Sequence, residues 1–108
     1  MAQKILITRF KFSLTPEEYK EALNPLGQTF ADVPECQWKI WLIDEEKHEG
    51  GAIYLFQDVK SLEDFKASPL VASVLSHPSL SDFDLRVCDT IKELNEITRA
   101  PMREEAVA

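Results

Sequence analysis

The sequence predicts a single α+β domain in which two helices cover one face of a four-stranded antiparallel sheet. Three observations support this fold class. The chain has 108 residues, which is enough for one hydrophobic core but not for two. Strand-like and helix-like segments follow in the order β-α-β-β-α-β, and right-handed crossovers then place both helices on the same face of the sheet. The second strand is apolar on both sides, so the other face needs a cover as well.

The first strand is predicted at Lys4–Phe12, a run rich in β-branched and aromatic residues. A helix is predicted to follow, because Thr15 suits the N-cap, Pro16 suits the first helical position, and two acidic residues in the first turn complement the helix dipole. Apolar residues then recur at spacings of three and four as far as Phe30. Pro25 predicts a kink or an interruption in this helix.

The middle of the chain predicts a β-hairpin. Residues 36–43 and 52–56 have the composition of strands, and residues 44–51 between them form a charged turn that ends in two glycines. A second helical segment is predicted to begin with Ser61 as its cap and to restart at the Ser-Pro sequence of residues 68–69. The alternation of apolar and polar residues at 82–89 then predicts the fourth strand.

These elements predict a ferredoxin-like βαββαβ domain over residues 1–97. Residues 90–97 form a short amphipathic stretch at its end. Residues 98–108 are polar, and we expect them to be a disordered tail.

The second strand also predicts a partner. Trp38, Ile40 and Leu42 fall on one side of this strand, and Trp41 and Ile43 fall on the other. Each such side chain that stays in water would lose about 1.5–3 kcal/mol of the stabilising free energy that its burial would contribute. A second copy of the chain that packs through the same face would cover these side chains, because a two-fold contact uses the same surface on both copies. We therefore expect a homodimer.

The composition argues against several classes of partner. The chain has 12 Lys and Arg against 19 Asp and Glu, a formal charge of −7, and this acidity disfavours nucleic-acid binding. The apolar run at residues 5–7 is too short for a signal peptide or membrane span, so we expect a cytoplasmic protein with no membrane partner. Cys36 and Cys88 lack metal-binding or redox spacing, which favours buried free thiols.

The most specific motif is Trp-Lys-Ile-Trp at residues 38–41, followed after six residues by His-Glu-Gly-Gly-Ala-Ile-Tyr-Leu-Phe at 48–56. This run resembles the YdhR-type monooxygenases. The resemblance extends to Asp58 and to Lys-Ser at residues 60–61, whereas Ala52 stands where a glycine of the family is expected. It implies the dimeric α+β barrel fold and a homodimer, and it carries no catalytic residues over to this chain.

The resemblance also implies a cofactor-independent monooxygenase, because related barrels oxidise phenols or quinols without a cofactor. A protein without flavin, haem or metal must take the electrons for oxygen reduction from the substrate itself. The expected substrate is therefore a small aromatic or quinol-like molecule whose anion is easily oxidised. The protein would supply a dry pocket, a general base and hydrogen-bond donors.

Aromatic residues and one histidine are candidates for these roles. Trp38, Trp41 and Tyr54 are candidates for lining the pocket, although they are equally suited to the sheet core and the dimer contact. His48 is the candidate base, because imidazole titrates near neutrality; the alternative is a solvated histidine in the hairpin turn.

Two cations on strands are further candidates. Lys39 and Arg86 could stabilise an oxyanion or bind an acidic substrate, or they could form surface ion pairs. A nucleophilic pair of Cys36 and His48, or an iron site using His48 and His77, has no supporting sequence motif.

Two other functions remain open. His77 late in the second helical segment could be the axial ligand of a haem-binding or haem-degrading barrel. The domain could also bind a small aromatic or lipophilic molecule without catalysing a reaction, because the lining of a binding pocket looks the same in both cases.

Overall fold

The structure is a computed structural model that describes residues 3–34 and 36–102. Within these ranges, four strands and four helices follow in the order β1 (Lys4–Phe12), α1 (Pro16–Ala31), β2 (Cys36–Asp44), β3 (Glu49–Phe56), α2 (Val59–Lys66), α3 (Pro69–Leu75), β4 (Leu80–Asp89) and α4 (Lys92–Ile97).

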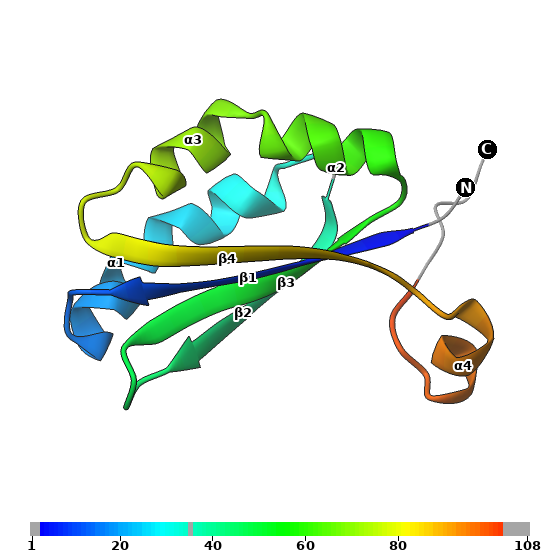
Figure 1. Cartoon of the computed structure of the whole chain (residues 1–108), viewed down its shortest axis with the longest axis horizontal. Helices are drawn as coiled ribbons and strands as arrows, with labels where there is room; N and C mark the ends of the chain where they lie inside the picture. Colours follow the sequence, from blue (N-terminus) through cyan, green and yellow to red (C-terminus); the bar gives the residue numbers. More distant parts are fainter. Residues whose placement is uncertain (1–2, 35, 103–108) are drawn as a thin grey trace.

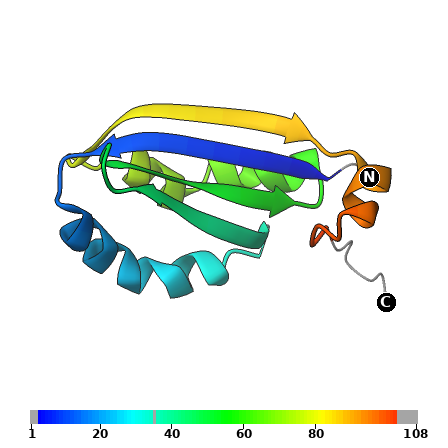
Figure 2. The same ribbon diagram turned by 90° about the horizontal axis from the view of Figure 1, so that it is seen from below.

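The strands form one antiparallel sheet in the order β2-β3-β1-β4. Helices α1, α2 and α3 lie on one side of this sheet, and α4 lies beyond the end of β4 (Figure 1). Figure 2 shows α1 running alongside β2, with α2 and α3 behind the sheet. This arrangement is the ferredoxin-like α+β fold, and the predicted fold class is confirmed.

The start of α1 follows the sequence prediction. Thr15 is the N-cap, its side chain accepts a hydrogen bond from the Glu18 N–H at 3.2 Å, and the Glu18 carboxylate accepts one from the Thr15 N–H at 2.9 Å. This reciprocal pair satisfies two backbone donors that the first turn would leave free. Pro25 lies inside α1, which runs without a break from Pro16 to Ala31, so the predicted interruption does not occur.

Some element boundaries differ from the prediction, most clearly at the starts of α2 and β3. The cap of α2 is Asp58 and not Ser61, because the Asp58 carboxylate accepts the Ser61 N–H at 2.8 Å. Gly50 and Gly51 belong to β3 and not to the turn. A Cβ atom on Gly51 would overlap the carbonyl oxygen of Thr8 on β1, so this glycine permits a close approach of two strands rather than a turn.

The core lies between the sheet and the helices. Leu6 and Phe56 on the sheet pack with Leu62 and Phe65 on α2, and all four are almost fully buried. Burial of each such side chain contributes about 1.5–3 kcal/mol to folding. None of the helices in the described ranges is long and apolar enough to cross a membrane.

The side of the sheet without these helices, here called the open face, is apolar along β2. Trp38, Ile40 and Leu42 lie on it, and Ile40 and Leu42 are 46% and 41% exposed. The C-terminal segment reaches this face, since the Trp38 indole N–H donates to the Pro101 carbonyl at 2.7 Å. Of the expected tail, residues 103–108 lie outside the described residues, so the domain end at residue 97 stays a prediction.

Candidate functional site

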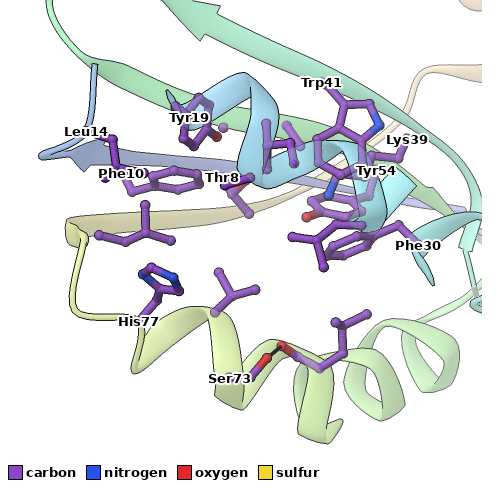
Figure 3. Close-up of a pocket in the computed structure, with 18 residues that line it drawn as sticks. Thr8, Phe10, Leu14, Tyr19, Phe30, Lys39, Trp41, Tyr54, Ser73 and His77 are labelled. Carbon is purple, nitrogen blue, oxygen red and sulfur yellow. Dashed lines mark hydrogen bonds between the residues drawn. The ribbon is translucent and has the colours of Figure 1, made fainter. Parts of the chain in front are cut away.

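A cavity of about 230 Å³ lies between the sheet and helices α1 and α3 (Figure 3). Ligand sites usually enclose about 300–1,000 Å³, so this cavity suits a small molecule of one or two rings. Its wall is mainly apolar, and the residues on it with aromatic or polar side chains are Thr8, Phe10, Tyr19, Phe30, Lys39, Trp41, Tyr54, Ser73 and His77.

The strand register brings three of the predicted site residues to this cavity. Lys39 lies directly opposite Tyr54, and Trp41 lies opposite Ala52, across the β2–β3 ladder. Because side chains alternate along a strand, Lys39 and Trp41 point to the same side of the sheet. The small side chain of Ala52, which is 2% exposed, leaves room between the larger neighbours.

Lys39 is enclosed by aromatic rings. Its Nζ atom lies 3.2 Å from the ring centre of Phe30, 3.5 Å from that of Trp41 and 4.8 Å from that of Tyr54. Ring faces offset part of the cost of burying an ammonium group, but they replace few of its hydrogen bonds to water. Burial therefore lowers the pKa of Lys39 to about 7, so the amine is neutral in about half of the molecules at that pH.

The tyrosines of the cavity stay protonated at neutral pH. Burial raises the pKa of Tyr54 well above its ordinary value, and a hydrogen bond with the Thr8 side chain opposes this only in part. Burial likewise raises the pKa of Tyr19 to about 12. The phenol groups are consequently available as hydrogen-bond donors next to an amine that can be neutral.

His77 follows α3 and enters the cavity from the helix side (Figure 3). Its Nδ1 atom accepts a hydrogen bond from the Ser79 N–H at 3.1 Å. The neutral ring therefore carries its hydrogen on Nε2 and can donate it to a ligand. The sequence suggests His77 only as a haem or iron ligand, and no local pattern indicates that it lines the same cavity as Lys39.

The other predicted site residues lie elsewhere. His48 is exposed in the β2–β3 turn, with a φ of 53° and its ring stacked on Phe12 at 5.3 Å between centres. Trp38 is on the open face. Arg86, on β4, is exposed and its Nε lies 3.5 Å from an Asp84 carboxylate oxygen. The structure therefore brings Lys39, Trp41 and Tyr54 together and leaves these three outside the cavity.

The cysteines differ in their surroundings. Cys36 is half-buried, and its thiol donates to the Trp38 carbonyl at 3.0 Å. Cys88 is exposed, so the prediction that both thiols are buried is wrong for this one, because β4 is an edge strand. Cys36 and His48 lie at opposite ends of the β2–β3 hairpin, which separates the two members of the conceivable nucleophilic pair. Within the described residues, no group of three His, Cys, Asp or Glu is placed to hold a metal ion.

Solved structures with this fold include oxygenases and proteins without an assigned function. SnoaB, a cofactor-independent oxygenase from Streptomyces nogalater, matches with a TM-score of 0.67 at 15% identity, over 84% of this chain and 95% of that chain. A dimeric ferredoxin-like protein from Thermobifida fusca matches with a TM-score of 0.66 at 14% identity, over 82% and 92% of the two chains. Protein SO0527 from Shewanella oneidensis gives a TM-score of 0.68 at 14% identity, over 82% and 91%.

No curated protein matches this sequence. The family described as "Putative mono-oxygenase ydhR" matches residues 5–101, which is nearly the whole length of the chain. The chain therefore belongs to the YdhR family.

Proposed function

We propose that this protein is a cofactor-independent monooxygenase that oxidises a small phenol or hydroquinone in the cavity between the sheet and the helices. One observation carries the proposal: the Lys39 amine lies inside a ring-lined cavity and can be neutral near pH 7. Membership of the YdhR family and the shared fold with a cofactor-independent oxygenase support the reaction class.

The first step is removal of a proton from the substrate. A general base works best when its pKa lies near the operating pH, and Lys39 meets this condition. The neutral amine accepts the phenolic proton and becomes an ammonium group beside the new phenolate. We assign the base to Lys39 in place of His48, because His48 lies in an exposed turn outside the cavity.

The phenolate then supplies the electrons for the reaction with oxygen. For a hydroquinone, one oxygen atom enters the ring to give a hydroxyquinone and the other leaves as water, so the substrate provides all four electrons that dioxygen takes up. The Lys39 ammonium group stabilises the negative charge that develops on superoxide and peroxide. The Tyr54 hydroxyl and the His77 Nε2–H are hydrogen-bond donors in the same cavity wall. The apolar wall limits access of water to these reactive species.

Two further properties complete the proposal. The open face is covered by a second copy of the chain, as supported by the exposed Ile40 and Leu42 and by the dimeric relative from Thermobifida fusca. The protein acts in the cytoplasm, where thiols stay reduced, and this fits the reduced state of Cys36 and Cys88 in the structure.

The test is oxygen uptake by the metal-stripped protein with a panel of hydroquinones and polycyclic phenols. We expect uptake that depends on the substrate, that falls at least about a hundredfold in Lys39→Met, since loss of a general base costs 10²–10⁴-fold, and that is retained in His48→Ala. Lys60→Met is the matched control, because it removes an exposed lysine of α2 that pairs with Asp64 at 2.9 Å.

Two results would overturn the proposal. Oxygen uptake that survives in Lys39→Met but disappears in His48→Ala would show that His48, in the hairpin turn, is the general base. The absence of uptake with every substrate, combined with saturable binding of the same phenols, would identify a ligand-binding dimer without catalysis.

The haem-binding alternative meets an obstacle at His77. Axial histidines usually donate their second ring N–H to an acceptor, whereas Nδ1 of His77 accepts a hydrogen bond from Ser79. Ligation through Nε2 would require the tautomer with hydrogen on Nδ1, and this would break the hydrogen bond from Ser79. We therefore expect haemin titration to give no Soret shift that depends on His77.

A further inference from the structure

Lys39 has a second chemical capacity that proton transfer does not use. Its amine lies on the cavity wall among Phe30, Trp41 and Tyr54, and the described part of the chain places no carboxylate within ion-pair distance of it. The ion pairs between described residues involve other cations. A lysine amine is a nucleophile when it is deprotonated, and desolvation in an apolar pocket is one of the ways in which proteins achieve this.

We propose that Lys39 is a covalent site for small aromatic aldehydes and ketones, which it binds as an imine (Schiff base). This is a separate activity of the cavity that needs neither oxygen nor an oxidisable substrate. It therefore does not depend on the proposed monooxygenase reaction, although it uses the same amine.

The reaction balances without an oxidant or a reductant. The nitrogen lone pair of Lys39 attacks the carbonyl carbon, a C–N bond forms, and the π electrons of the carbonyl move to its oxygen. This oxygen receives a proton to give a carbinolamine. A second proton then allows the C–O bond to break, and water leaves while the C=N bond forms. The two protons lost by the nitrogen equal the two that depart in the water.

Tyr54 is placed to assist these proton transfers. It lies directly across the ladder from Lys39, and its ring centre is 4.8 Å from the Lys39 Nζ. Its hydroxyl stays protonated at neutral pH because burial raises its pKa. The hydroxyl can therefore donate to the carbonyl oxygen while the amine attacks the carbonyl carbon.

The cavity wall defines which carbonyl compounds fit. Its volume of about 230 Å³ and its aromatic rings suit a molecule of one or two flat rings. Among the described residues that line it, Lys39 and His77 alone can carry a positive charge. Carbonyl compounds with several negative charges, such as sugar phosphates, would therefore lack counter-charges, and neutral aromatic aldehydes are the preferred class.

The experiment traps the imine in the full-length protein. Benzaldehyde is added at pH 7 with sodium cyanoborohydride, under nitrogen, and the hydride reduces the imine to a stable secondary amine. Intact mass spectrometry gives the number of adducts and peptide mapping gives their positions. Lys20 is the internal reference, because it is exposed and its hydrogen bond with Glu45 raises its pKa, which keeps it protonated.

We expect labelling at Lys39 to be at least about tenfold faster than at Lys20, since an ordinary lysine is almost fully protonated at pH 7. Tyr54→Phe should slow the labelling, but Lys39 should remain the labelled residue. Lys60→Met should leave both the rate and the position of labelling unchanged. Lys39→Met should remove the fast adduct. Labelling spread evenly over the surface lysines, or equally fast in Lys39→Met, would overturn the proposal.

The design keeps this result separate from the oxygenase test. Fast labelling of Lys39 in a protein without oxygen uptake would support the imine site alone, and uptake without fast labelling would reject it alone. If Lys39→Met fails to fold, the wild-type comparison of Lys39 with Lys20 still decides the question. Protection of Lys39 by unreactive phenol, with no protection of Lys20, would then assign the adduct to the cavity.

Discussion

Lys39 and Tyr54 face each other across β2 and β3, and both side chains reach the cavity between the sheet and the helices. Burial disfavours the charged form of both groups, so it lowers the pKa of the amine and raises that of the phenol. Near neutral pH the pair therefore combines a neutral base with a protonated donor. Such a pairing of titratable groups is typical of active sites and carries our assignment of this cavity.

The first prediction concerns the pH dependence of oxygen uptake. Only the neutral amine of Lys39 can accept the phenolic proton, so kcat/KM should rise with pH and level off above about 7. His48→Ala should retain this profile, because that side chain lies outside the cavity. An inflection near pH 7 that persisted in the residual activity of Lys39→Met would show that another group is the base.

The second prediction concerns stability. Between pH 7 and about 10 the unfolded chain holds the Lys39 proton, whose ordinary pKa is 10.5, while the folded chain has released it. Unfolding then takes up a proton, so the free energy of unfolding contributed by this group rises with pH in this window. The contribution of Lys39 to the free energy of unfolding is lowest below pH 7, where the folded protein must hold a buried ammonium group.

Urea unfolding of the wild type and Lys39→Met at pH 6.5, 8 and 9.5 measures this effect. The wild type should gain stability relative to the variant as the pH rises. Tyr19 and Tyr54 oppose the trend only above pH 10, where their raised pKa values make the folded protein retain protons. A difference between the two proteins that does not change with pH would mean that the Lys39 amine is solvated.

Much of the fold could be predicted from the sequence because its signals are local. The Thr15 cap and Pro16 define the start of α1 within a few residues of chain, the β-branched and aromatic composition defines β1, and alternation defines β4. The glycines at 50 and 51 were misassigned, because a turn and a close strand approach both favour glycine. Only the packing of β3 against Thr8 separates the two cases.

The site was less predictable because it depends on contacts between distant elements. Lys39 was expected only as a cation, and its lowered pKa results from Phe30 of α1 and from neighbouring strands. His77 reaches the cavity because α3 packs on the sheet. This packing leaves no recognisable pattern in the sequence. The prediction of His48 as the base depends on its residue type and on its acidic neighbours in the turn, and the hairpin places it outside the cavity.

The third prediction tests the close approach of β1 and β3. Gly51→Ala should lower the free energy of unfolding by about 1–3 kcal/mol, because the new Cβ meets the Thr8 carbonyl and forces the strands apart. Gly27→Ala is the matched control. Gly27 lies inside α1 with nothing within 4 Å of the added atom, so its replacement should raise stability by about 0.5–1 kcal/mol.

Chemical unfolding of both glycine variants provides the comparison. Equal and small effects would indicate that β1 and β3 are further apart than described. Because Gly51 also lines the cavity, a folded Gly51→Ala protein should show weaker binding of phenols, whereas Gly27→Ala should bind them as the wild type does.

The fourth prediction concerns the open face. Trp41 lies at the cavity, so replacing it cannot test the dimer, whereas Ile40 is 46% exposed on the face we expect a second copy to cover. Ile40→Asp would place a charge in an apolar contact twice in each two-fold dimer. We expect the dissociation constant of the dimer to increase at least about a hundredfold, since each 1.4 kcal/mol of lost binding free energy changes it about tenfold.

Light scattering across a concentration series measures this change. The wild type should have twice the chain mass of 12.3 kDa, and Ile40→Asp should have the mass of one chain at the same micromolar concentration. Glu49→Gln, which alters a charged residue at the start of β3, should stay dimeric. A wild-type protein that is monomeric and stably folded would mean that the apolar side chains of β2 tolerate water, and the covering of the open face by a second copy would then be rejected.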